Sequence, residues 1–95
     1  MAEVSERVII TVKEIQGRGI CSYGIKPGDC WTITSEETPP KFCAWALQAI
    51  FPFLTVLRFG GEFPWEEDKD TAVVCCPDPH NPVVFELRRV KSERS

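Results

Sequence analysis

The sequence lacks the features of a secreted, membrane-spanning or nucleic-acid-binding protein. Its first residues, Met-Ala-Glu-Val-Ser-Glu-Arg, contain neither a basic start nor an apolar run, so we expect no secretory signal and a cytoplasmic location. The apolar run of residues 42–59 is interrupted by polar side chains and by Pro52 near its middle, which argues against a membrane span. The eleven Lys and Arg residues are outnumbered by fourteen Asp and Glu residues and form no basic stripe, so we expect no nucleic-acid partner.

Cations cluster only near the C-terminus of the chain. They are Arg88, Arg89, Lys91 and Arg94. Charges at the end of a chain are usually hydrated, so we predict that this group is a solvated tail.

Motifs of common catalytic sites are also absent from the sequence. It contains no G-x-x-x-x-G-K-[ST], G-x-S-x-G or H-E-x-x-H motif, and His80 is its single histidine. An acid–base mechanism would have to use His80 or carboxylates. The sequence therefore does not indicate an enzyme, and a non-enzymatic binding or interaction module is the first interpretation.

Five cysteines are present without any C-x-x-C pair. In a cytoplasmic protein, an odd number of cysteines indicates free thiols, a metal site or redox chemistry rather than a disulfide framework. Cys21, Cys43 and Cys76 lie in a loop or at the end of an element, so they could meet at one end of a sheet. Together they would suit zinc or an iron–sulfur cluster, with Cys75 and His80 as weaker candidates.

Two other interpretations of the thiols stay open. Cysteine is often buried as a small apolar residue without further function. Cys43 lies near the start of a predicted helix, whose positive end favours the thiolate, so it could instead form a redox pair with Cys21 or Cys76. A metal-binding or iron–sulfur redox protein is therefore the alternative function.

The stretch from 40 to 61 predicts the central helix of the domain. Thr38 is the expected N-cap, and the helix continues to about Phe51. Pro52 cannot donate a helical hydrogen bond, so we predict a kink or a break there, followed by a second short helix to Arg58. Gly60 or Gly61 is suited to the left-handed conformation that ends a helix.

Four segments with alternating or β-branched character predict strands at 7–15, 30–34, 71–76 and 83–90. The order β-β-α-β-β predicts one α+β domain over residues 1–95, with a mostly antiparallel sheet, a helix on one face, an ordered core at about 7–90 and short flexible termini. The helix face that carries Trp45, Ala49 and Val56 would remain uncovered by such a sheet. We therefore expect a homo-oligomer.

The acidic segment 61–70 contains two aromatic residues, Phe63 and Trp65. One interpretation is a solvated loop whose aromatic side chains fold back onto the domain. The other is a binding lip, in which Phe63 and Trp65 line the mouth of a small-molecule pocket. Which small molecule or protein would bind is not specified by the sequence.

Several motifs resemble a family of small conserved hypothetical proteins of prokaryotes. They are Cys-x-x-Gly followed by Gly-Asp (Cys21, Gly24, Gly28 and Asp29), the Cys-x-Trp-Ala helix that begins at Cys43, and Cys-Pro-Asp-Pro (Cys76, Pro77, Asp78 and Pro79). The resemblance covers residues 8–89 and implies a cytoplasmic protein of similar fold. It includes Cys21, Cys43 and Cys76, but not Cys30, Cys75 or His80.

Overall fold

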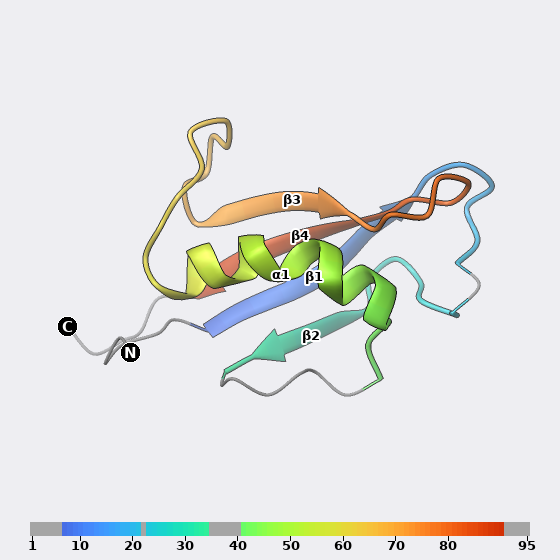
Figure 1. Ribbon diagram of the computed structural model, residues 1–95, viewed down its shortest axis with the longest axis horizontal. Coiled ribbons are helices and arrows are strands. Elements are labelled where there is room, and N and C mark those ends of the chain that lie inside the picture. The colour runs from blue at the N-terminus through green and yellow to red at the C-terminus, as the bar shows by residue number, and fades with distance from the viewer. Residues whose placement is uncertain (1–6, 22, 35–40, 91–95) are drawn as a thin grey trace.

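The protein is a four-stranded antiparallel sheet with a single described helix across one face (Figure 1). The computed structural model describes residues 7–21, 23–34 and 41–90. Its elements are β1 (Arg7–Ile15), β2 (Cys30–Ile33), α1 (Ala44–Arg58), β3 (Thr71–Cys75) and β4 (Val83–Val90). The strands lie in the order β2-β1-β4-β3, which confirms the predicted α+β class. The predicted flexible termini lie outside the described residues.

β1 is central because its two sides pair with β2 and β4. Ile10 lies opposite Trp31 of β2 and Leu87 of β4, and a bulge shifts the register between Val12 and Glu14. Successive residues of a strand point to opposite faces, so alternation of apolar and polar residues buries one face and exposes the other. The bounds of β1 and β4 agree with those predicted from this alternation.

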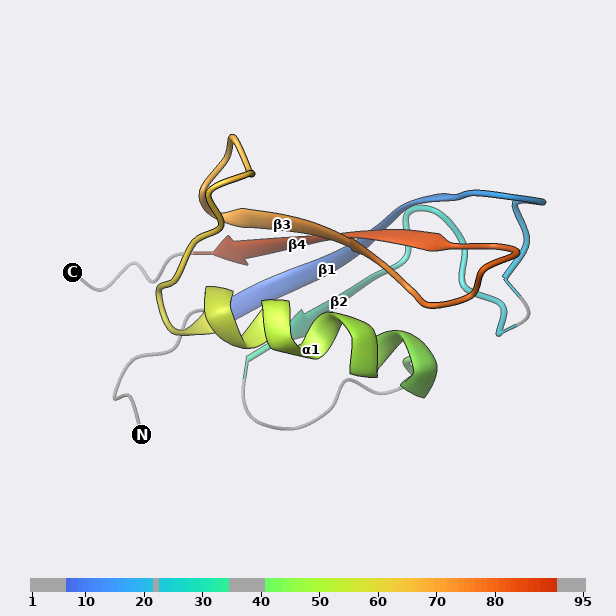
Figure 2. The same ribbon diagram turned by 45° about the horizontal axis from the view of Figure 1, so that its top comes forward.

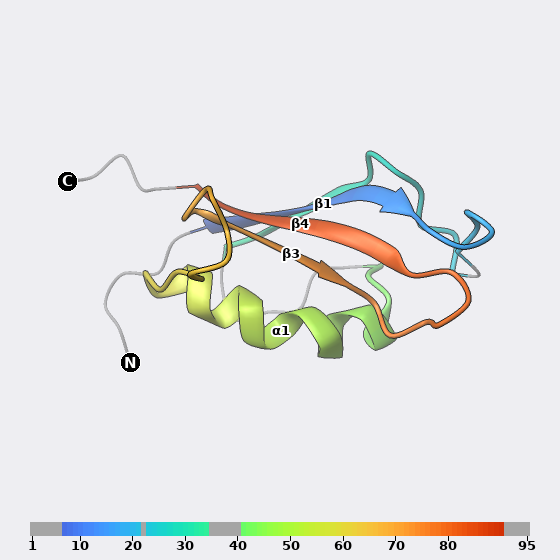
Figure 3. The same ribbon diagram turned by 90° about the horizontal axis from the view of Figure 1, so that it is seen from above.

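The hydrophobic core lies between the sheet and α1, as the view along the layers shows (Figure 3). Fully or almost fully buried side chains come from β1 (Val8, Ile10, Val12), β4 (Val83, Phe85, Leu87) and α1 (Ala46, Ile50, Leu54, Leu57). The helical set recurs every three or four residues, which places it on one side of α1. One face of the helix is therefore covered by the sheet.

The start of α1 differs from the sequence prediction. Thr38 lies outside the described residues, but Lys41 and Phe42 are described and are not helical, and Cys43 is the N-cap. Phe42 is buried, with its ring 4.6 Å from that of Trp31 and 5.6 Å from that of Phe85. These long-range contacts hold the chain in a non-helical conformation up to Cys43.

α1 also continues through Pro52 as one helix, so the predicted second short helix is wrong. Pro52 removes the donor for the Gln48 carbonyl, but both residues are on the exposed side, where water can satisfy that carbonyl. The helix ends as predicted at Gly60, which has φ 90°. Hydrogen bonds from Gly60 N–H to Leu57 O and from Gly61 N–H to Val56 O form a Schellman motif.

Candidate functional site

The sheet covers one side of α1, and the other side points away from it (Figure 3). Several large apolar side chains of α1 are exposed. Trp45 is 54% exposed, Phe59 is 40% exposed and Val56 is 36% exposed. Ala49 lies between them at helical spacing and is half-buried. Phe51 is 46% exposed but lies about 200° around the helix from Ala49, so it is on another side of α1. We use "outer face" for Trp45, Ala49, Val56 and Phe59. It is an apolar surface, as the sequence predicted for its first three residues.

Aromatic contacts connect α1 to the 61–70 loop, which leads from α1 to β3 (Figure 2). The Phe53 ring centroid lies 5.4 Å from that of Phe63, and the Phe63 centroid lies 5.0 Å from that of Trp65. Phe63 is only 8% exposed, whereas Trp65 is 65% exposed. Of the two predicted lip residues, Phe63 therefore packs in the core and only Trp65 faces solvent.

The buried side chain of Arg89 fixes the C-terminal end of α1 to the sheet. Its guanidinium donates to the Leu57 carbonyl at 3.0 Å, the Gly61 carbonyl at 2.8 Å and the Lys69 carbonyl at 2.9 Å. Its Nε and Nη2 donate to Asp70 Oδ1 at 3.1 and 2.9 Å. All five guanidinium N–H groups are thus used. The predicted solvated tail is wrong at Arg89, because this residue is 8% exposed.

The position of Arg89 in β4 is a sequence signal for its burial. Val83, Phe85, Leu87 and Arg89 occupy alternate positions of one strand, so they point to the same face. A buried arginine on the inward face requires a partner for its charge, and the half-buried Asp70 supplies it. The link between them spans 19 residues, so no local pattern identifies the partner.

The acidic loop is held by specific hydrogen bonds rather than being simply solvated. Glu66 Oε2 accepts a hydrogen bond from the N–H of Val73, on the edge strand β3, at 3.0 Å. This N–H is therefore not available for pairing with a strand of another chain. Lys69 Nζ donates to the carbonyls of Phe63 and Pro64 at 3.1 and 3.3 Å. These contacts set the path of the loop that presents Trp65.

The pKa of Asp68, in the same loop, reports on the hydrogen bonds that hold the loop. The backbone N–H of Asp70 and the Arg88 guanidinium both donate to its carboxylate, and these bonds lower the pKa of Asp68 below its usual value. A carboxyl whose folded pKa is lowered stabilises the fold above its unfolded pKa, and this contribution is lost as the pH falls through the folded pKa. We expect Arg88→Met to raise the pKa of Asp68 only partway to its usual value, because the Asp70 N–H bond is the larger cause.

Carboxyl ¹³C NMR titration measures this pKa. Arg18→Met, in a different loop, is the control and should leave the Asp68 titration unchanged. Identical Asp68 titrations in the wild type and Arg88→Met would contradict the assigned contact.

The three cysteines of the predicted thiol cluster all contact the hydrophobic core. Cys76 is buried, and its Sγ accepts a hydrogen bond from the Val83 N–H at 3.3 Å. Cys21 and Cys43 are half-buried and pack against the same core. The loop before β2, the start of α1 and the end of β3, which carry these cysteines, reach the same end of the sheet (Figure 1). The contacts are those of small apolar side chains.

Residues 7–21, 23–34 and 41–90 contain no group of three or more His, Cys, Asp or Glu side chains that could hold a metal ion. Cys75 and His80, the weaker candidates, are both exposed. The zinc or iron–sulfur site at Cys21, Cys43 and Cys76 therefore stays a prediction from the sequence, without support from the arrangement of these side chains.

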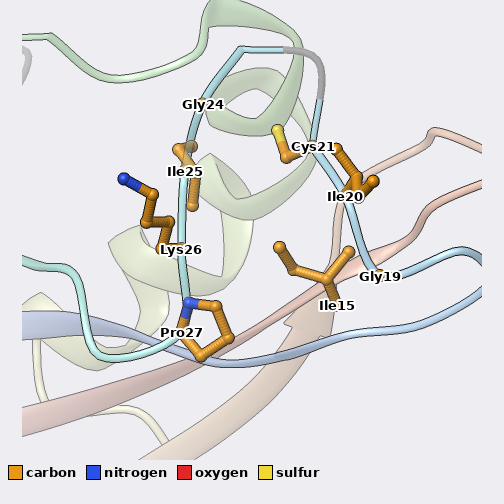
Figure 4. Close-up of a pocket in the computed structure, with 8 residues that line it drawn as sticks. All are labelled: Ile15, Gly19, Ile20, Cys21, Gly24, Ile25, Lys26 and Pro27. Atoms are coloured by element: carbon orange, nitrogen blue, oxygen red, sulfur yellow. The ribbon is translucent and has the colours of Figure 1, made fainter.

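A pocket of about 280 Å³ lies between the end of β1 and the loop that leads to β2 (Figure 4). Its walls include Ile15, Ile20, Ile25 and Pro27, and the Cys21 thiol faces the space between the two arms of the loop. Phe63 and Trp65 are not among its lining residues. This pocket therefore differs in location from the one for which a lip of Phe63 and Trp65 was predicted.

The class that this architecture defines is an α+β domain with one helix on an antiparallel four-stranded sheet. No protein-family model matches the chain, and comparisons with curated proteins and with solved structures also give no match. The family resemblance of the motifs stays a prediction.

No helix in the described ranges is both long enough and apolar enough to cross a membrane.

Proposed function

We propose that this protein is a non-enzymatic interaction module that forms a homodimer through the outer face of α1. The observation that carries the proposal is the exposure of Trp45, Val56 and Phe59 on that face, at 54%, 36% and 40%. Contiguous apolar surface of this kind on a small soluble domain marks an interaction site.

The size of the apolar surface supports a weak dimer. An aromatic side chain presents about 200 Å², so the exposed fractions of Trp45 and Phe59 leave roughly 190 Å² on the outer face of each copy. With Val56 and neighbouring atoms, two copies would bury less than about 1,200 Å², in the range of weak, transient interfaces. Interfaces of this size belong to weak complexes, and we expect a dissociation constant of roughly tens of micromolar.

A second copy of this chain suits the face because the face is self-complementary. Trp45 and Phe59 lie about 21 Å apart along the helix, with the small Ala49 and the compact Pro52 between them. In an antiparallel two-fold pairing, Trp45 of each copy would pack beside Phe59 of the other, and the helices could approach closely at the centre. Arg58, the single charged residue of α1, is 7% exposed, so two copies would meet without like charges on the face.

Trp45→Lys is expected to weaken the dimer at least tenfold, because it removes an anchor and places charges in the interface. Sedimentation equilibrium from about 5 to 200 µM measures the mass, which is 10.8 kDa for one chain. Tyr23→Lys is the matched control, because Tyr23 is an aromatic residue of similar exposure, 52%, in the loop before β2. It should leave the dissociation constant unchanged.

A wild-type mass of 10.8 kDa over the whole concentration range would contradict the homodimer. Equal weakening by Trp45→Lys and Tyr23→Lys would also contradict the assignment of the interface to α1.

A further inference from the structure

We propose that the pocket between β1 and the loop before β2 is a binding site for a small, neutral, mostly apolar molecule. The proposal is independent of the dimer, because the eight lining residues come from the end of β1 and the two arms of the loop and include no residue of the outer face of α1. Its floor belongs to the core, since Ile25 is 5% exposed and both Ile15 and Cys21 pack against the core cluster.

The loop that forms the pocket is held in place without a ligand. At its base, Val12 N–H donates to Asp29 O and Gly28 N–H donates to Val12 O, both at 2.9 Å. Its first arm is tied to the β3–β4 connection by the Arg18 N–H, which donates to Asn81 Oδ1 at 3.0 Å. A pocket that is largely preformed binds a ligand with little ordering cost.

The ligand size follows from the volume. An apolar cavity of about 150 Å³ accommodates benzene, and this pocket has about 280 Å³. A molecule of two fused rings, with about ten non-hydrogen atoms, therefore matches the space. Larger ligands would extend into solvent at the open side.

The ligand polarity follows from the walls. Ile15, Ile20, Ile25 and Pro27 present hydrocarbon, and the Cys21 thiol is a weakly polar group. Lys26 is the single charged residue in the lining, and Figure 4 shows its ammonium directed away from the space between the arms. Ile20 is 69% exposed, so a ligand against it would remove apolar surface from water. A neutral aromatic bicycle fits these walls better than an anion or a sugar.

Titration with indole, followed by ¹H–¹⁵N NMR, tests the site. At ordinary ligand efficiency, a molecule of this size binds with a dissociation constant on the order of 1 mM. We expect saturable shifts of the Gly19 and Gly24 amides, which lie on the two arms of the pocket, up to about 5 mM indole. The Gly60 and Gly61 amides at the end of α1 are internal controls and should not shift with the same curve. No shift at Gly19 and Gly24 up to 5 mM would overturn the proposal, as would equal shifts at all four glycines.

A pair of variants assigns the binding to the walls of the pocket. Ile20→Ser removes one wall and should weaken indole binding at least threefold, and Val73→Ser is the matched control because Val73 is also apolar and is 52% exposed on β3. Unchanged affinity in Ile20→Ser, or an equal loss in Val73→Ser, would overturn the assignment. Sedimentation of the same samples measures the dimer separately. Loss of indole binding should leave the sedimentation mass unchanged, and a monomeric mass should leave indole binding unchanged.

Discussion

Arg89→Met is expected to lower the free energy of unfolding by about 3 kcal/mol, because it removes a charged group that makes five hydrogen bonds in a mostly buried site. Methionine has a side chain of similar length, so little packing is lost. The decrease in the free energy of unfolding comes mainly from oxygen atoms that lose the guanidinium as a hydrogen-bond donor. The carbonyls of Leu57 and Gly61 at the end of α1 would lose this partner. Urea denaturation followed by circular dichroism measures the change.

Arg88→Met is the matched control for Arg89→Met, since it makes the same chemical change at the next position. Arg88 contacts Asp68 at 2.9 Å and Glu86 at 3.4 Å, but 45% of its side chain is exposed. Surface ion pairs contribute about 0–1 kcal/mol, so a loss in this range is expected. Equal losses in the two variants would contradict the role assigned to Arg89.

Gly17→Ala is expected to be the second strongly destabilising change, with a loss of about 3 kcal/mol from a backbone clash and a strained conformation. A Cβ at Gly17 would overlap the carbonyl of His80, and the residue has φ 68°. Relief of the clash would separate the β1–β2 loop from the β3–β4 connection. The 2.8 Å bond from Gln16 N–H to Pro82 O would then be lost.

Gly24→Ala separates the clash from the backbone strain. Gly24 has φ 100°, but a Cβ there meets no atom within 4 Å. Gly24→Ala should therefore lose only the free energy needed to hold an alanine at positive φ, about 1–2 kcal/mol. Thermal or urea unfolding should therefore show a smaller loss for Gly24→Ala than for Gly17→Ala. The reverse order would mean that the close approach of the two loops does not contribute to stability.

The strands and the class of the fold could be predicted because their signal is local. In β1, Val8, Ile10 and Val12 alternate with polar or less buried residues over a span in which β-branched side chains are frequent. A strand that buries one face needs apolar residues at every second position, and this requirement does not depend on which strands it pairs with. The same reasoning predicted the bounds of β4, Val83–Val90.

The candidate surfaces were predicted only in part. The outer face of α1 was visible in the sequence, because an apolar helix has more hydrophobic faces than one sheet can cover. One interpretation of the 61–70 segment had both aromatic side chains fold back onto the domain, and this is confirmed for Phe63 but not for Trp65. The pocket around Cys21 was not visible, because it depends on segments that meet only in the folded chain. The thiols show the same limit: the sequence placed them near element ends, but it could not define the distances between their sulfur atoms.

The sequence by itself determined the period of each strand, the apolar character of α1 and its end at Gly60, because these depend on neighbouring residues and on backbone sterics. The tertiary structure decided where α1 begins, through the packing of Phe42 on Trp31 and Phe85. It also decided that Asp70 is the partner of the inward-facing Arg89. The physical reason is that burial and hydrogen-bond pairing depend on contacts between residues far apart in the chain, which no local pattern specifies.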